Sequence, residues 1–102
     1  MIKNVQILQG YTQIVSASEN SLANLGIYFC NSSDKADVLD VFVMSSDQTA
    51  GDETKVISKL YIPASETFMF GNEKFILDVG ESIGASSEVG GRIAATVTFT
   101  DL

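Results

Sequence analysis

The sequence predicts an all-β protein, an antiparallel β-sandwich of about eight strands that is jelly-roll-like or immunoglobulin-like. Residues 92–100 alternate strictly between two faces, and no segment shows apolar residues at helical spacing. Short apolar runs in residues 62–86 are separated by three turn signals: Pro63-Ala64, Gly71-Asn72 and Gly80-Glu81. A chain of 102 residues is expected to form one domain, residues 1–102.

Four strands are expected in the first half of the chain: Asn4–Gln9, Tyr11–Val15, Leu22–Cys30 and Val38–Met44. Gly10 lies between the first two and marks a bulge or a kink. Residues 16–20 form a polar loop, and residues 31–35 form a turn-rich connection.

The fourth of these strands is apolar on both faces. Leu39, Val41 and Val43 share one face, and the other carries Val38, Phe42 and Met44 beside Asp40. Such a strand is either buried on both sides or in contact with a partner. Because a buried carboxylate is costly, Asp40 indicates that the second face is only partly covered.

The second half begins with the polar stretch 45–54, which is expected to be an exposed and mobile loop. Lys55–Ile62 then alternates and should end at Pro63, which lacks the amide proton of a strand ladder. This alternation predicts an inward set, Val56, Ser58, Leu60 and Ile62, and an outward set, Ile57, Lys59 and Tyr61.

The remaining strands are short, except for the last. Phe68–Phe70 and Phe75–Leu77 flank Gly71-Asn72, which suits a two-residue hairpin turn. Ile83–Ala85 follows the turn at Gly80-Glu81. The final strand, Arg92–Thr100, places Ile93, Ala95, Val97 and Phe99 on one face and mostly threonines on the other.

The residue types exclude several kinds of catalytic site. The chain has no histidine and no tryptophan, so it lacks a Ser–His or Cys–His nucleophile pair and any imidazole base or ligand. A metal-dependent cupin, whose site is histidine-rich, is excluded for the same reason. The single cysteine, Cys30, rules out an intramolecular disulfide, and we expect it to be a small buried side chain, with a reactive thiol as the alternative.

Carboxylates are closely spaced in two segments: Asp34, Asp37 and Asp40, and then Asp47, Asp52 and Glu53. Such oxygen ligands could bind calcium, but neither group matches an EF-hand loop, and solvated loop charge is the simpler interpretation. A glycosidase pair would need a much larger cleft. We therefore assign no catalytic, metal or cofactor-binding residue and expect a protein without a cofactor that is not an enzyme.

Charge and hydropathy limit the partners. The formal net charge is −7, and the six cationic residues are scattered, so we expect no binding to nucleic acid. No stretch reads as a signal peptide or approaches the roughly 20 apolar residues of a membrane helix, so we expect no membrane association.

The apolar residues on second faces are the best internal indication of a protein contact. A thick two-sheet core with loops over its outer face is the alternative. We predict a homo-oligomer whose interface includes six residues: Val38, Phe42, Met44, Ile57, Tyr61 and Met69.

The order of segments in the second half carries a resemblance. It runs through an Ile62-Pro63-Ala64 turn, Glu66-Thr67, an apolar hairpin, the Val79-Gly80-Glu81-Ser82-Ile83 turn and the terminal strand Ala95–Phe99. Together with the two strands of Gly26–Met44, this order resembles small virion proteins of tailed bacteriophages, of the kind carried by viruses of marine cyanobacteria. Glu81 stands where Asp is commoner in that pattern.

The resemblance implies a non-enzymatic structural protein of the virion: a head decoration, neck, tail or fibre component. Such proteins bind other virion proteins and are made in the host cytoplasm. The alternative function is a carbohydrate- or ligand-binding β-sandwich module, which predicts exposed Tyr11, Tyr28 or Tyr61 beside the polar loop residues Asp47, Gln48 and Asp52. An enzyme that uses only carboxylates would need a concave pocket with two close acids.

Overall fold

The computed structural model describes residues 1–70 and 76–102, apart from the side chain of Leu25. These residues contain nine strands and no helix, which confirms the all-β prediction. The strands are β1 (Ile2–Ile7), β2 (Gly10–Ser16), β3 (Leu22–Asn31), β4 (Asp37–Met44), β5 (Lys55–Ile62), β6 (Thr67–Phe70), β7 (Ile76–Leu77), β8 (Ser82–Ser87) and β9 (Ile93–Asp101). The hairpin turn predicted at Gly71-Asn72 lies outside the described residues.

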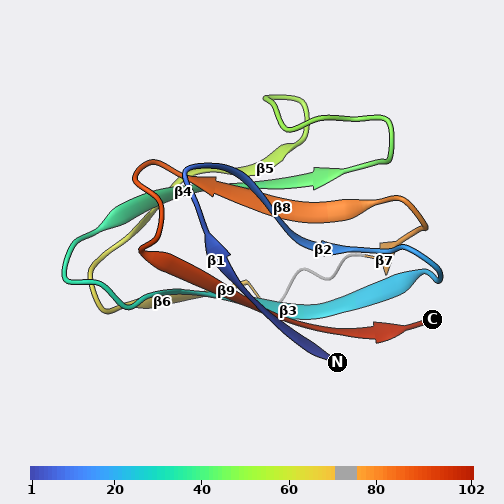
Figure 1. Cartoon of the computed structure of the whole chain (residues 1–102), viewed down its shortest axis with the longest axis horizontal. Helices are drawn as coiled ribbons and strands as arrows, with labels where there is room; N and C mark the ends of the chain where they lie inside the picture. The colour runs from blue at the N-terminus through green and yellow to red at the C-terminus, as the bar shows by residue number, and fades with distance from the viewer. Residues whose placement is uncertain (71–75) are drawn as a thin grey trace.

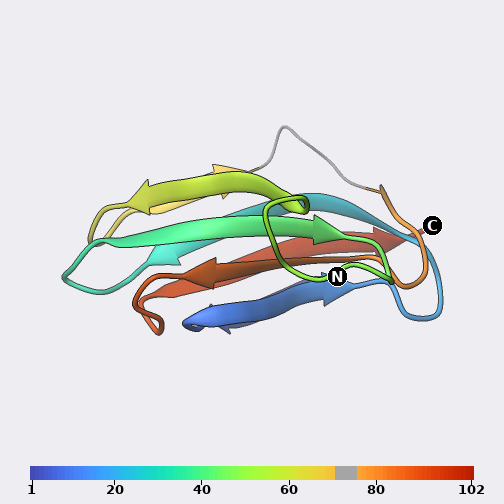
Figure 2. The same ribbon diagram turned by 90° about the horizontal axis from the view of Figure 1, so that it is seen from above.

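The strands form two antiparallel sheets that pack face to face (Figure 1). Sheet A has the order β1-β9-β3-β6, with β7 also paired to β3, and sheet B has the order β2-β8-β4-β5. Figure 2 shows the strands of sheet B lying over those of sheet A. Leaving aside the two-residue β7, this alternation of strands between two four-stranded sheets is the jelly-roll order. The jelly-roll alternative of the prediction is therefore the one observed.

The core lies between the sheets and is built by the alternation of each strand. In β9, Ile93, Ala95 and Val97 are fully buried, and Phe99 packs against the same cluster. Their inward side chains meet those of sheet B because alternate residues of a strand share a face. The buried cluster comprises Ile7, Ile14, Val15, Ala17, Leu22, Ile27, Phe29, Leu39, Val41, Ile62, Leu77, Ile83, Ala85, Ile93, Ala95 and Val97.

The predicted alternation of β5 is wrong in its first half. Val56 is exposed, whereas Ile57 packs against the core together with Leu60. The register between β4 and β5 shifts twice, and Lys59 adopts a positive φ of 55°. Between the pairs Leu39–Leu60 and Val41–Ile57, β5 has one residue more than β4. An extra residue of this kind moves the side chains beyond it to the opposite side of the sheet. Ile57 is therefore an inward residue and not an outward one.

Candidate interaction surface

The outer face of sheet B holds two of the predicted interface residues, and this chain buries both of them itself. Phe42 is only 5% exposed and Met44 only 8% exposed, although neither belongs to the core between the sheets. Phe42 and Met44 are buried and Ile57 is partly buried against the core, so three of the six predicted interface residues offer little surface in this structure. The alternative interpretation had loops over this face, whereas the residues that lie against Phe42 belong to the strands β2 and β5.

An aromatic cluster covers Phe42 on this face. The ring of Tyr11 in β2 meets the Phe42 ring edge-on at 5.9 Å between centroids, and Lys55 Nζ lies 5.8 Å from the Phe42 centroid. Tyr11 can reach across because β8 contributes Gly84: a Cβ at that position would overlap the Tyr11 ring. The glycine therefore makes room for the side chain that seals this part of sheet B.

Charges on this face are paired with their own chain. Asp40 Oδ1 accepts a hydrogen bond from the backbone N–H of Lys59 at 2.7 Å, and its Oδ2 lies 3.7 Å from Lys55 Nζ. Lys55 Nζ also lies 3.6 Å from the carboxylate of Asp52. This pairing explains how Asp40 is tolerated in an otherwise apolar strand, because a half-buried carboxylate needs such partners.

Burial raises the pKa of the Tyr11 phenol above its ordinary value. A hydrogen bond with the Ser82 side chain acts in the opposite direction and is the smaller influence. Desolvation disfavours the charged phenolate relative to the neutral phenol.

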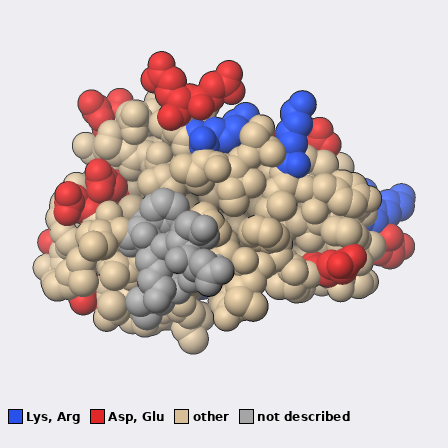
Figure 3. Space-filling view, turned by 180° about the vertical axis from the view of Figure 1, so that it is seen from behind, with Lys and Arg blue, Asp and Glu red and all other residues tan. Residues whose placement is uncertain are grey.

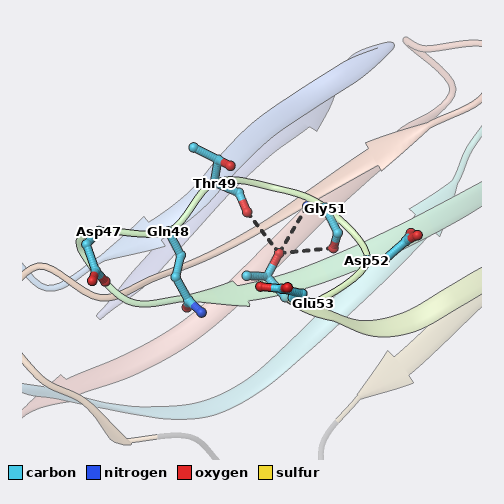
Figure 4. A pocket seen from close by; sticks show the side chains of 7 residues that line it. Asp47, Gln48, Thr49, Gly51, Asp52 and Glu53 are labelled. Atoms are coloured by element: carbon cyan, nitrogen blue, oxygen red, sulfur yellow. Dashed lines mark hydrogen bonds between the residues drawn. The ribbon is translucent and has the colours of Figure 1, made fainter.

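The loop between β4 and β5 closes on itself through hydrogen bonds. The Thr54 hydroxyl oxygen lies 3.1 Å from the carbonyl oxygens of both Thr49 and Gly51, which share its single proton, and it accepts a hydrogen bond from the N–H of Gly51 at 3.1 Å. Thr54 itself is buried. The loop surrounds an open hollow of about 370 Å³ (Figure 4). Loop residues alone line it: Asp47, Gln48, Thr49, Gly51, Asp52, Glu53 and Thr54.

The acids of this loop do not form a ligand set. Asp47 and Asp52 lie on opposite sides of the hollow in Figure 4, and their carboxylates do not converge. Among the described residues, no group of three or more Asp, Glu, Cys or His side chains is placed to hold a metal ion. Asp47 and Asp52 are therefore not placed as a pair that could share acid–base chemistry.

The other predicted interface residues lie on two different faces. Val38 is half-buried and pairs with Tyr61, which is exposed, on the outer side of sheet B. Met69 is 62% exposed and lies on sheet A. The six residues therefore do not form one continuous surface, and whether any of them contacts a partner stays a prediction.

The outer face of sheet A carries a feature that the sequence analysis missed: among its described residues there is no charged side chain. Directly paired residues point to the same side of a sheet, so the register places Asn4, Thr96, Tyr28 and Met69 in one row across all four main strands. We call this surface the neutral face. It comprises Ile2, Asn4, Gln6, Ala23, Gly26, Tyr28, Cys30, Thr67, Met69, Ile76, Ala94, Thr96, Thr98 and Thr100.

Several polar groups of the neutral face are bonded within the sheet. The Thr96 hydroxyl donates to Asn4 Oδ1 at 2.6 Å, and the Thr98 hydroxyl lies 3.4 Å from the carbonyl of Gly26. The Gln6 side-chain amide donates to the backbone carbonyl of Ile93 at 3.2 Å. Polar atoms that already have partners lose less when water is removed from the surface.

Large apolar side chains stand among these small polar residues. Ile2 and Ile76 are 70% and 68% exposed, and Tyr28 is 40% exposed. Cys30 is also exposed here, which corrects the expectation that it is a buried side chain. Alternation in β3 turns Cys30 and Tyr28 outward because Ile27 and Phe29 face the core.

Charged residues gather elsewhere on the molecule. Figure 3 shows the largest group of acidic side chains along the upper rim of the view, on the side of sheet B. The loop acids Asp47, Asp52 and Glu53 follow β4, a strand of that sheet. The outer face of sheet A thus has no charged side chain among its described residues and exposes large apolar side chains. The outer face of sheet B carries charges and buries Phe42 and Met44.

No family model matches this chain, and no match was found among the curated proteins or the solved structures. In the described part of the chain there is no helix with the length and apolar character needed to cross a membrane. The proposals below therefore depend on the geometry and on the sequence.

Proposed function

We propose that this protein is a non-enzymatic structural component of a tailed-phage virion, such as a head decoration, neck, tail or fibre protein. It acts by self-association and by binding other virion proteins, after synthesis in the host cytoplasm. The neutral face carries this proposal: it is a broad, uncharged sheet surface with exposed Ile2, Tyr28, Met69 and Ile76. Exposed apolar area of this kind is a typical protein-binding surface.

Two further observations support the proposal by analogy. The strand order is that of a jelly roll, an architecture used in viral capsid proteins, although it also serves lectins and cupins. The resemblance of residues 62–99 and Gly26–Met44 to small virion proteins points to the same class.

The test combines association and particle binding. Light scattering coupled to size-exclusion chromatography at micromolar protein should give a mass above the 10.9 kDa of one chain. Co-sedimentation with purified phage heads and tails should then retain the protein on one of these parts. A strictly monomeric protein that binds neither part would rule the proposal out.

A carbohydrate-binding module is the second candidate, because all three tyrosines are exposed. None of them, however, is among the residues that line the loop hollow, and Tyr28 lies on the opposite sheet from Tyr11 and Tyr61. A glycan array probed with the wild type and with Tyr61→Ala decides the matter. Binding that Tyr61→Ala abolishes would favour this candidate, and an array without a binder would remove it.

A further inference from the structure

We infer that the neutral face is a homodimer contact, in which sheet A of one copy packs against sheet A of a second copy about a two-fold axis. The inference rests on the proposed function and names the partner and the surface through which self-association occurs. Sheets pack in this way inside β-sandwiches, with their strand directions about 30° apart and a spacing of about 10 Å.

The absence of charged side chains from the described residues of the neutral face favours a second copy as its occupant. Two chains of net charge −7 repel each other, and a two-fold contact brings equivalent patches of the two copies together. A charged patch would then oppose itself, whereas threonine, alanine and glycine are compatible with their own copies. A basic partner would be drawn to the loop acids Asp47, Asp52 and Glu53 instead.

The size of the face is sufficient. The fourteen positions of the neutral face, about 4.8 Å apart between strands and about 6.8 Å apart along them, give a flat extent of roughly 460 Å² before side-chain relief. The smaller specific interfaces bury about 600 Å² of accessible surface from each partner. Since side-chain relief adds accessible area to the flat extent, the neutral face reaches this range.

Three of the four edge strands, β1, β2 and β5, oppose the other common route of β association, which adds strand to strand. In β1, Lys3 pairs with the inward-facing Val97 and so places a cation on the inner side of that edge. The edge strand β2 has a register shift between Gln13 and Val15, and β5 has two shifts as well as the positive φ of Lys59. Bulges and inward charges of this kind discourage edge pairing at these three strands, which favours a face contact over pairing there.

The first experiment adds one carboxylate to each of two exposed edge-strand positions. Met69→Glu changes the neutral face, and Val56→Glu changes β5 of sheet B by the same charge. Sedimentation velocity should show a dimer dissociation constant raised by more than about tenfold in Met69→Glu and by less than about threefold in Val56→Glu. Ile2→Glu in β1, with Leu8→Glu just after that strand as its control, repeats the comparison if Met69→Glu does not fold.

A second measurement uses Cys30, the only cysteine of the chain, as a reporter on the neutral face. Its reaction with N-ethylmaleimide should slow as the protein concentration passes through the dimerisation range. Added salt should strengthen the dimer, because it screens the repulsion between the copies and the face contains no ion pair to weaken.

The outcomes separate this inference from the proposed function. A dimer that Met69→Glu and Val56→Glu affect equally, with Cys30 equally reactive at all concentrations, would overturn the neutral-face contact and leave self-association intact. A monomer that still binds phage heads or tails would overturn the dimer and leave virion binding intact. A monomer that binds neither would remove both.

Discussion

The two outer faces of this sandwich differ in how far their large apolar side chains are exposed to solvent. On sheet B, Phe42 and Met44 are buried, and Tyr11 and Lys55 of the same chain lie against the Phe42 ring. On sheet A, Tyr28 and Met69 stand uncovered among small neutral residues. Sheet B, whose outer residues are more apolar in the sequence, therefore buries them, whereas sheet A, whose outer residues are mostly small and polar, leaves its few large apolar side chains exposed. Local hydrophobicity alone does not identify a free surface.

The largest expected effect tests whether Phe42 serves the fold. Phe42→Ala should reduce the free energy of unfolding by about 3 kcal/mol, because it leaves a cavity under Tyr11 and Lys55. Tyr28→Ala, on the open face, should reduce it by less than about 1 kcal/mol. Urea denaturation of both variants measures the difference. Equal losses would mean that the two faces are not covered differently.

The next effect tests the covering of sheet B by Tyr11. Gly84→Ala should reduce the free energy of unfolding by about 2 kcal/mol, because the new Cβ overlaps the Tyr11 ring. Gly51→Ala is the matched control, since nothing lies within 4 Å of its Cβ position, and it should change stability by less than about 0.5 kcal/mol. In a Tyr11→Ala background, Gly84→Ala should lose most of its effect. Additive losses would argue against this ring placement.

The smallest effect is a dependence of stability on alkaline pH. The pKa of Tyr11 is raised in the folded protein, so the folded state holds this proton more tightly than the unfolded state does. The contribution is complete below the ordinary phenol pKa of about 10, and it is lost as the pH rises from there towards the folded pKa. The stability difference between the wild type and Tyr11→Phe should therefore be constant from pH 7 to 9 and shift against the wild type above about pH 10. A difference that is constant throughout would contradict the burial of this phenol.

Several elements of the fold were predictable from local pattern. β9 follows its predicted alternation with all its inward residues in or against the core, and β5 ends before Pro63 as expected. Strict period-two alternation and an imino acid without an amide proton are properties of the chain itself. Which side chains of β5 point inward was less predictable. The two register shifts between β5 and β4 arise only when the strands pair, so they leave no periodic signal in β5 alone.

The candidate surface was less accessible to sequence reasoning. Met69 was identified from its apolar neighbours and is exposed, but Phe42, Met44 and Ile57 were placed on a surface that the fold closes. The neutral face is assembled from alternate residues of separate strands, so its lack of charge is invisible until the register is known. Threonines and alanines in β9 and a single Tyr28 in β3 give no signal on their own.

The sequence by itself determined the all-β class, most strand positions, the absence of imidazole chemistry and the acidic charge, because these depend on composition and on short-range periodicity. Only the tertiary structure decided the jelly-roll strand order, the covering of sheet B and the uncharged outer side of sheet A. The physical reason is that side chains distant in sequence, such as Tyr11, Phe42 and Gly84, determine each other's exposure only after the strands have paired.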